Sequence, residues 1–342
     1  MDWPTVSERM KEFRKATPGL VEVFDDTPCY EEEDVRFLEK IESEYAFCDD
    51  ADRRAAMLRV CVEALKNVRR RANAPERIYL WPEGKMPTIT EFTDNSDLRY
   101  NHGPEFRPYM LEMLLPEDVT PKGAVVCIPG GDHGASSVKE GYQVARDLNK
   151  LGYQAFILHN RVNHNPWSEQ ESGVDTARAI RMIRRDAAKY RVSPDNIAVA
   201  GFSNGGLTGD NCIRYFSGSK KVKDVFPDYV EDELDQVYGA PDAFMCVYGP
   251  RFVGSQYDFT GVKYPPTFFA VGREDSAMDN LNYVYPIMVN QGIPVEIHTF
   301  AGVPHGVAGL AFRAGDHPYP TFDLWYPLAD AFMQNVYAKN KK

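Results

Sequence analysis

The chain has 342 residues, 43% of them hydrophobic and 12% aromatic, which is enough for one large core and a smaller accessory unit. Its net charge of −11 argues against a nucleic-acid partner, because Lys and Arg side chains do most of the binding to phosphate backbones. The sequence has neither an apolar run long enough to span a membrane nor the basic and then apolar start of a secretory signal. We therefore expect a cytoplasmic protein with no membrane partner.

Residues 1–76 carry apolar side chains at helical spacing and are predicted to form a helical N-terminal extension. The three stripes are Val6, Met10 and Phe13; Val35, Leu38, Ile41 and Tyr45; and Met57, Cys61, Leu65 and Val68. A segment of this length is a weak candidate for a free-standing domain. We therefore expect the stripes to be covered either by the rest of the chain, as a cap, or by the same segment of a second copy in a homo-oligomer.

From residue 77 to residue 342, predicted strands alternate with predicted helices, which indicates one α/β domain. Strands are predicted over 108–115, 123–128, 154–158, 197–200, 243–248, 267–271 and 294–300, and helices over 138–151, 171–190, 205–215, 279–291 and 323–338. Because the strands are mainly apolar and helices separate them, we predict a doubly wound, mostly parallel sheet. The polar face of the helix over 171–190, with Arg178, Arg181, Arg184 and Arg185, is expected in solvent.

No metal or redox site is predicted, and no cofactor is expected. The six cysteines are scattered without C-x-x-C spacing, and Cys127 and Cys246 lie in apolar runs typical of strands. They are expected to be reduced core residues. The spacing of His159 and His164 does not suit a metal pair on one helix face.

A G-x-S-x-G sequence, Gly201-Phe202-Ser203-Asn204-Gly205, directly follows the apolar run 197–200. In a nucleophile elbow the chain turns sharply from strand to helix, so small residues are needed on both sides of an exposed serine. A plain glycine-rich turn is the alternative. The strand before the motif and apolar positions at helical spacing after it favour the elbow, which makes Ser203 the candidate nucleophile.

A serine nucleophile needs a neighbouring base, which is itself oriented by a carboxylate. In the order Ser…Asp…His of such hydrolases, Asp275 follows the strand 267–271 and His305 follows the strand 294–300. Glu274 and Asp279 remain alternatives for the acid. Of the other histidines, His298 is interpreted as a strand residue, His317 as a surface-loop residue, and His102 precedes the sheet core.

The negative oxygen formed in acyl transfer must also be stabilised, usually by two backbone N–H groups. Asn204, directly after the nucleophile, is predicted to supply one of them at the start of its helix. The segment Ile128-Pro129-Gly130-Gly131-Asp132-His133 is predicted to supply the other. A phosphate-binding glycine loop is the competing interpretation, but neither G-x-G-x-x-G nor a Walker Lys-Ser/Thr is present.

Several motifs in order resemble the α/β-hydrolase acetyl-xylan-esterase-like family, which includes carbohydrate acetyl esterases and feruloyl esterases. They are Leu80-Trp81-Pro82, Ile128-Pro129-Gly130-Gly131, Gly201-Phe202-Ser203-Asn204-Gly205-Gly206, Gly272-Arg273-Glu274-Asp275, and Gly292-Ile293-Pro294-Val295-Glu296 through Pro304-His305-Gly306. The resemblance covers roughly residues 78 to 337. It implies a catalytic domain with a Ser-His-Asp mechanism that needs no metal or cofactor and acts on acetylated sugars or similar small esters.

The chain departs from that family at two places. Asp132-His133 stands where the family commonly has a third glycine or an aromatic residue, and a carboxylate close to the oxyanion would repel it. Gly131 is therefore preferred over Asp132 as the second N–H donor, and His133 is a candidate substrate contact. The segment 159–167 is more polar than its family counterpart, so Trp167 is a candidate platform for a sugar ring; a tryptophan packed on the core is the alternative.

The function predicted from these residues is a serine carboxylesterase that removes small acyl groups, in particular acetyl groups of carbohydrates, through an acyl-enzyme. Its expected partner is a small-molecule or oligosaccharide ester. A serine peptidase of the prolyl-oligopeptidase type shares fold and residue order, but it normally carries a propeller domain that 76 residues cannot form. A non-catalytic binding protein on the same fold is the third alternative; it would usually lack one of the three residues, and none is missing here.

Overall fold

The computed structural model describes residues 2–26, 29–89, 106–131, 139–161, 168–250, 259–309 and 319–340. The described residues up to Glu76 form one compact unit, and those from Arg77 onward form a second, larger one. No helix in the described segments is both long and apolar enough to cross a bilayer.

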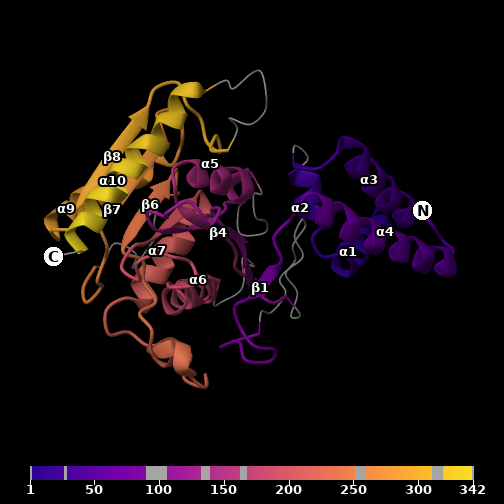
Figure 1. Cartoon of the computed structure of the whole chain (residues 1–342), viewed down its shortest axis with the longest axis horizontal. Helices are drawn as coiled ribbons and strands as arrows, with labels where there is room; N and C mark the ends of the chain where they lie inside the picture. Colours follow the sequence, from indigo (N-terminus) through magenta and orange to yellow (C-terminus); the bar gives the residue numbers. More distant parts are fainter. Residues whose placement is uncertain are drawn as a thin grey trace. The chain divides into compact units, whose positions relative to one another are not determined.

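The first unit is a bundle of four helices: α1 (Trp3–Ala16), α2 (Leu20–Asp25), α3 (Glu32–Ala46) and α4 (Ala51–Arg71) (Figure 1). The predicted stripes pack on one another in a core made of Phe13, Leu20, Val23, Tyr30, Val35, Leu38, Ile41, Tyr45, Cys61, Leu65 and Val68. The stripes therefore cover one another to a large extent within this unit, and the expected cap or contact between copies stays a prediction. The short helix α2, which was not predicted, adds Leu20 and Val23 to that core.

The second unit contains an eight-stranded sheet in the order β1-β2-β4-β3-β5-β6-β7-β8. The strands are β1 (Arg77–Tyr79), β2 (Tyr109–Met113), β3 (Ala124–Ile128), β4 (Gln154–His159), β5 (Ile197–Phe202), β6 (Ala243–Val247), β7 (Thr267–Gly272) and β8 (Val295–Phe300). Strand β2 runs antiparallel to both β1 and β4, and all other pairs are parallel. The predicted mostly parallel α/β sheet is confirmed; the edge strand β1 was missed because it is short and only partly buried.

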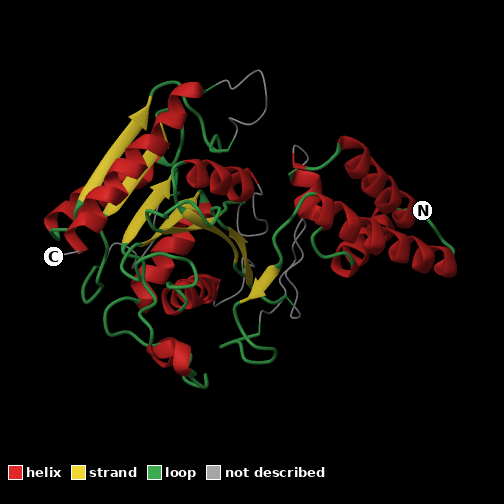
Figure 2. Ribbon diagram, in the orientation of Figure 1, coloured by secondary structure: helices red, strands yellow, loops and turns green. Residues whose placement is uncertain are grey.

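Helices cover both faces of this sheet (Figure 2). The main ones are α5 (Val144–Lys150), preceded by a π-helical turn at Lys139–Gln143, and α6 (Ser168–Arg185), α7 (Asn204–Phe216), α9 (Met278–Asn290) and α10 (Trp325–Asn340). On β5, Val199 faces α7, whereas Phe202 packs edge-on against Trp325 of α10 with ring centroids 5.7 Å apart. Because side chains alternate along a strand, α7 and α10 lie on opposite faces.

The arginines of α6 correct one expectation. Arg178 is buried and pairs with Asp232 (Nη1–Oδ1, 2.7 Å), and Arg181 is buried beside Asp235 (Nη1–Oδ1, 3.4 Å). Arg184 pairs with Asp242, and only Arg185 keeps about half of its side chain exposed, at 52%. The segment that follows α7, whose placement the sequence did not predict, lies over this face of α6 and supplies the carboxylates.

Candidate active site

The topology places a switch point at the carboxyl ends of the central strands. From β3 the chain passes to β4 on one side, and then to β5 on the other side of β3. At such a switch point the loops leaving the two neighbouring strands separate, and ligands bind between them. Ile128 at the end of β3 pairs with Gly201 near the end of β5, so the segments that follow these strands begin side by side.

Ser203 occupies a sharp turn between β5 and α7. Its φ of 50° and ψ of −126° are rare for a residue with a side chain, and such strain collects at functional sites. A Cβ at Gly201 would lie 2.3 Å from the carbonyl oxygen of Gly205, and one at Gly205 would lie 2.0 Å from that of Ile128. Only glycine fits at either position, which is the geometry expected of a nucleophile elbow.

The structure brings the three predicted residues into one chain of hydrogen bonds. His305 Nε2 lies 2.8 Å from Ser203 Oγ, and His305 Nδ1 lies 2.8 Å from Asp275 Oδ2. The Asp275 side chain is fully buried, whereas 45% of the His305 side chain is exposed. The imidazole can therefore exchange protons with a substrate at the surface while its carboxylate partner remains shielded from water.

The alternatives for the acid and the base lie elsewhere. Glu274 and Asp279 are exposed, whereas Asp275 Oδ1 also accepts the N–H of Ala277 at 2.8 Å, which fixes the orientation of its carboxylate. His298 contacts Glu296 on β8, and His159 stacks on Tyr109 at 4.5 Å between ring centroids. His102, His133, His164 and His317 lie outside the described residues.

Two carboxylates act electrostatically on His305. The hydrogen bond to Asp275 raises the pKa of His305 above its ordinary value of 6.5; burial opposes this, and the charges of Asp275 and Glu140 add to the rise. An ionised partner favours the charged imidazolium, which is the form that a base reaches after it accepts a proton from serine.

One predicted oxyanion donor directly follows Ser203, and the other follows Gly130, which lies against Ser203. Asn204 is the first residue of α7, where the helix dipole favours negative charge. Gly131 follows β3 with a φ of 133°, a conformation that suits glycine, and the preceding Gly130 N–H donates to Glu140 Oε2 at 2.7 Å. The less favoured donor Asp132 and the candidate substrate contacts His133 and Trp167 lie outside the described residues.

Glu140 and Tyr248 were missed by sequence reasoning although both lie next to the site. Glu140 is an acidic residue near the start of a predicted helix, a place that is usually exposed, yet it is buried. Tyr248 directly follows β6 with a φ of 39°, and its ring lies 5.0 Å from that of His305. Nothing in the local sequence marks Glu140; the strand-end position of Tyr248 is the single signal that could have drawn attention to it.

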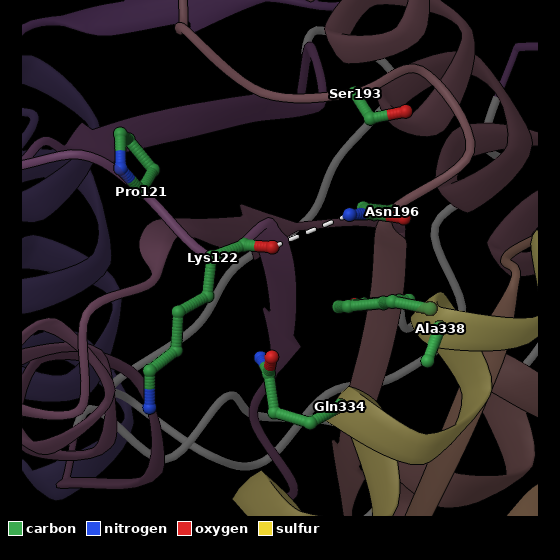
Figure 3. A pocket seen from close by; sticks show the side chains of 7 residues that line it. Pro121, Lys122, Ser193, Asn196, Gln334 and Ala338 are labelled. Carbon is green, nitrogen blue, oxygen red and sulfur yellow. Dashed lines mark hydrogen bonds between the residues drawn. The ribbon is translucent and has the colours of Figure 1, made fainter. Parts of the chain in front are cut away.

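A pocket of about 410 Å³ lies at the opposite edge of the sheet, lined by Pro121, Lys122, Ser193, Asn196, Gln334, Tyr337 and Ala338 (Figure 3). Lys122 and Asn196 precede β3 and β5, whereas Ser203 follows β5. Because β3 and β5 are parallel, their starts lie at the edge away from Ser203. This pocket is therefore separate from the site at Ser203.

Comparison with known proteins finds similar sequences, and the match that is located in the chain lies within the second unit. Residues 111–210 match the family described as BD-FAE. Endo-1,4-beta-xylanase B of Butyrivibrio fibrisolvens is 26% identical over 168 residues, 47% of this chain and 25% of that protein. Acetylxylan esterase of Xylanibacter ruminicola is 34% identical over 99 residues, 27% of this chain and 19% of that protein. The chain thus spans about a quarter and a fifth of the lengths of these two curated relatives.

Solved structures share the fold at lower identity. An acetyl ester-xyloside bifunctional hydrolase from Caldicellulosiruptor lactoaceticus is 23% identical with a TM-score of 0.60, covering 77% of this chain and 97% of the other. Thermogutta terrifontis esterase 2 phosphorylated by paraoxon is 18% identical with a TM-score of 0.56, covering 77% of this chain and 94% of the other. These likenesses establish the fold of the second unit.

Proposed function

We propose that the chain is a serine carboxylesterase for small acyl esters, a proposal supported by its α/β-hydrolase fold and by its similarity to acetyl-xylan-esterase-like proteins. The observation that carries the proposal is the unbroken chain of hydrogen bonds from Ser203 through His305 to Asp275. One relative, named an acetylxylan esterase, supports an acetyl group as the acyl part and xylan as the alcohol part.

In the proposed mechanism, His305 Nε2 takes the Oγ proton of Ser203 as Oγ attacks the ester carbonyl. The N–H groups of Asn204 and Gly131 stabilise the negative oxygen that forms. His305 then returns the proton to the departing alcohol oxygen, which leaves an acyl group on Ser203. A water molecule repeats the sequence: His305 accepts its proton, the hydroxyl attacks the acyl carbon, and Ser203 recovers a proton as the carboxylic acid leaves. Asp275 stays ionised throughout and holds the imidazole in one tautomer.

A substrate panel tests this function. p-Nitrophenyl acetate, butyrate and octanoate should be compared with a proline p-nitroanilide peptide and with acetylated xylo-oligosaccharides, whose acetate release is measured directly. Preference for acetate and release from the oligosaccharide support the proposal. Cleavage of the anilide alone would favour a peptidase, and turnover of none of them would favour a binding protein.

The pH dependence of kcat/KM should follow the protonation of His305. Only the neutral imidazole accepts the serine proton, and the hydrogen bond to Asp275 raises its pKa above 6.5. Activity should therefore be lost as pH falls through that raised pKa, with the midpoint of the acid limb above 6.5. The profile is measured with p-nitrophenyl acetate in buffers of constant ionic strength. A midpoint well below 6.5 would contradict the assigned Asp275–His305 pair.

For the first unit we propose a role in access to the site or in association between copies, rather than in chemistry. Trp3, Phe37, Phe47 and Val60 are exposed on it, at 65%, 46%, 60% and 51% of their surfaces, and such side chains favour contacts with other surfaces. The Ser203–His305–Asp275 chain and the larger core contain only residues beyond Glu76, among the residues described.

Deleting residues 1–76 should therefore leave the labelling of Ser203 by a fluorophosphonate intact, while it changes subunit number, solubility or ester preference. Labelling is followed by peptide mapping, and subunit number by light scattering coupled to size exclusion. A truncated protein with the same subunit number, solubility and ester preference as the full chain would contradict the proposed role of the first unit.

A further inference from the structure

A buried carboxylate joins the two loops that flank Ser203. Glu140 Oε2 accepts the N–H of Gly130 at 2.7 Å, and Glu140 Oε1 accepts the hydroxyl of Tyr248 at 2.7 Å. The Tyr248 hydroxyl in turn accepts the N–H of Ala308, three residues after His305, at 3.2 Å. One side chain thus connects the segment after β3 with the segment that carries the base.

The hydrogen-bond directions in this network are determined. Backbone N–H groups of Gly130 and Ala308 can only donate, and a phenol has a single hydrogen to give. Burial, followed by the charge of Glu140, raises the pKa of Tyr248 well above 10, so the phenol keeps its hydrogen and gives it to Glu140. Both Glu140 oxygens then accept, which is the arrangement that suits an ionised carboxylate.

The glycine held by Glu140 has no room for a side chain. A Cβ at Gly130 would lie 2.6 Å from Cβ of Ser203, 2.6 Å from the carbonyl oxygen of Phe202 and 2.8 Å from Glu140 Oε2. The backbone of Gly130 therefore lies against both the nucleophile residue and the carboxylate, with no space for a side chain. Gly131, the proposed oxyanion donor, is the next residue, so its position depends on this contact.

On the other side of the network, Tyr248 contacts the base. Its ring meets the imidazole of His305 at 63° with centroids 5.0 Å apart, and its backbone N–H donates to Ala270 at 2.7 Å. The strand before it is linked to the elbow, since Ser203 N–H donates to Val247 at 3.1 Å. Movement of Tyr248 would therefore displace both the imidazole and the elbow.

We propose that Glu140 is a positioning residue for the esterase chemistry: through Gly130 it sets the oxyanion loop, and through Tyr248 it sets the imidazole of His305. The inference rests on the proposed function, because it assigns Glu140 a role in that reaction. Glu140 does not touch the substrate carbonyl in this scheme. Its effect belongs to the transition state, since misplacement of a donor or a base weakens interactions that form fully only there.

Glu140→Gln removes the charge and one of the two acceptors but keeps the size. We expect kcat to fall about 10- to 100-fold with KM within about twofold, because an oxyanion donor misplaced by a fraction of an ångström retains only part of its effect. The low-pH limb of the kcat/KM profile should also move to lower pH, because the pKa of His305 should fall. Asp275, Glu140 and the neutral Tyr248 are the groups that face His305 among the described residues, and removing one negative charge disfavours the imidazolium.

Tyr248→Phe separates geometry from charge. It removes the hydroxyl but leaves the ring on His305 and the charge on Glu140, so kcat should fall about tenfold while the acid limb does not move to lower pH. A general loss of stability would not produce this difference between the two variants. If Glu140→Gln fails to fold, Tyr248→Phe decides the question, and an unchanged kcat overturns the proposal.

The matched controls come from the opposite end of the sheet. The hydroxyl of buried Tyr153 donates to Asp330 Oδ1 at 2.7 Å and accepts Gln334 Nε2–H at 3.0 Å, which reproduces the bonding of Tyr248. Tyr153→Phe and Asp330→Asn should lower the midpoint of thermal unfolding without changing kcat or the acid limb. If they reduce kcat as much as the Glu140 and Tyr248 variants do, the effect is one of stability and the positioning role is overturned.

The possible outcomes distinguish a failure of this inference from a failure of the proposed function. A wild-type protein that hydrolyses no ester and takes no fluorophosphonate overturns the proposed function and this inference with it. An active wild type whose folded Glu140→Gln variant has the same kcat and the same acid limb overturns the role of Glu140 alone. The measurements are kcat, KM and fluorophosphonate labelling rate for each variant between about pH 5 and pH 9, a range that brackets the ordinary histidine pKa of about 6.5.

Discussion

Replacing Ser203 by alanine should reduce kcat for p-nitrophenyl acetate by about 10⁴- to 10⁶-fold, because no acyl-enzyme can form without Oγ. The substitution removes one hydroxyl from a half-buried residue, and the glycines that the turn needs at 201 and 205 stay in place. The variant should therefore fold, which is checked by circular dichroism and thermal unfolding. Wild-type protein treated with a fluorophosphonate should carry the adduct on the peptide that contains Ser203, whereas the variant should carry none.

Ser193→Ala is the matched control. Ser193 is exposed at the opposite edge of the sheet, where its hydroxyl accepts the N–H of Asp195 at 3.3 Å. Its loss should leave both kcat and labelling unchanged. Wild-type activity in folded Ser203→Ala would exclude Ser203 as the nucleophile, and an adduct on another residue would point to a different one.

Replacing Asp275 by asparagine should lower kcat by on the order of 10⁴-fold with the structure intact. The reason lies in the second hydrogen bond of this side chain: Oδ1 accepts the N–H of Ala277, so the amide oxygen of asparagine would take that place. The amide NH₂ would then face His305 Nδ1 and make it an acceptor. The ring hydrogen would move to Nε2, which could no longer accept the proton of Ser203.

The same variant should move the remaining acid limb to lower pH, because the hydrogen bond and charge of Asp275 raise the pKa of His305. Glu274→Gln is its control: it makes the same change of charge on the preceding side chain, which is exposed. That control should change kcat by less than about twofold, as expected of a surface residue. If Glu274→Gln is the more damaging of the two, Asp275 is not the acid.

The sheet could be read from the sequence because its strands are buried on both faces. Strands such as β3, β5 and β7 are continuous apolar runs, and helices that cross the sheet separate them. Their positions were predicted to within about two residues. The elbow could also be predicted from the sequence. The close approach of Gly205 to Ile128 allows no side chain, so the turn requires a glycine that is visible in the local sequence.

The candidate site could be predicted only in part from the sequence. Order along the chain and strand-end position selected Ser203 and His305, but they did not separate Asp275 from Glu274 or Asp279. That choice depends on which carboxylate is buried against the imidazole, a property of packed loops from β7 and β8 rather than of either loop alone. Glu140 had no local signal at all, because its partners are 10 and 108 residues away in the chain.

The sequence by itself determined the fold class, the elbow and the identity of the nucleophile and base candidates, because each depends on local patterns of burial, turn geometry and residue order. The tertiary structure decided which polar groups meet. It brought Arg178 and Arg181 of α6 under carboxylates of a distant segment, and it packed the N-terminal stripes on one another. The sequence of a helix with one polar face does not show whether that face lies in solvent or under another segment of the chain. Burial of charge is favourable only where a partner arrives, and that partner is supplied by contacts between residues far apart in sequence.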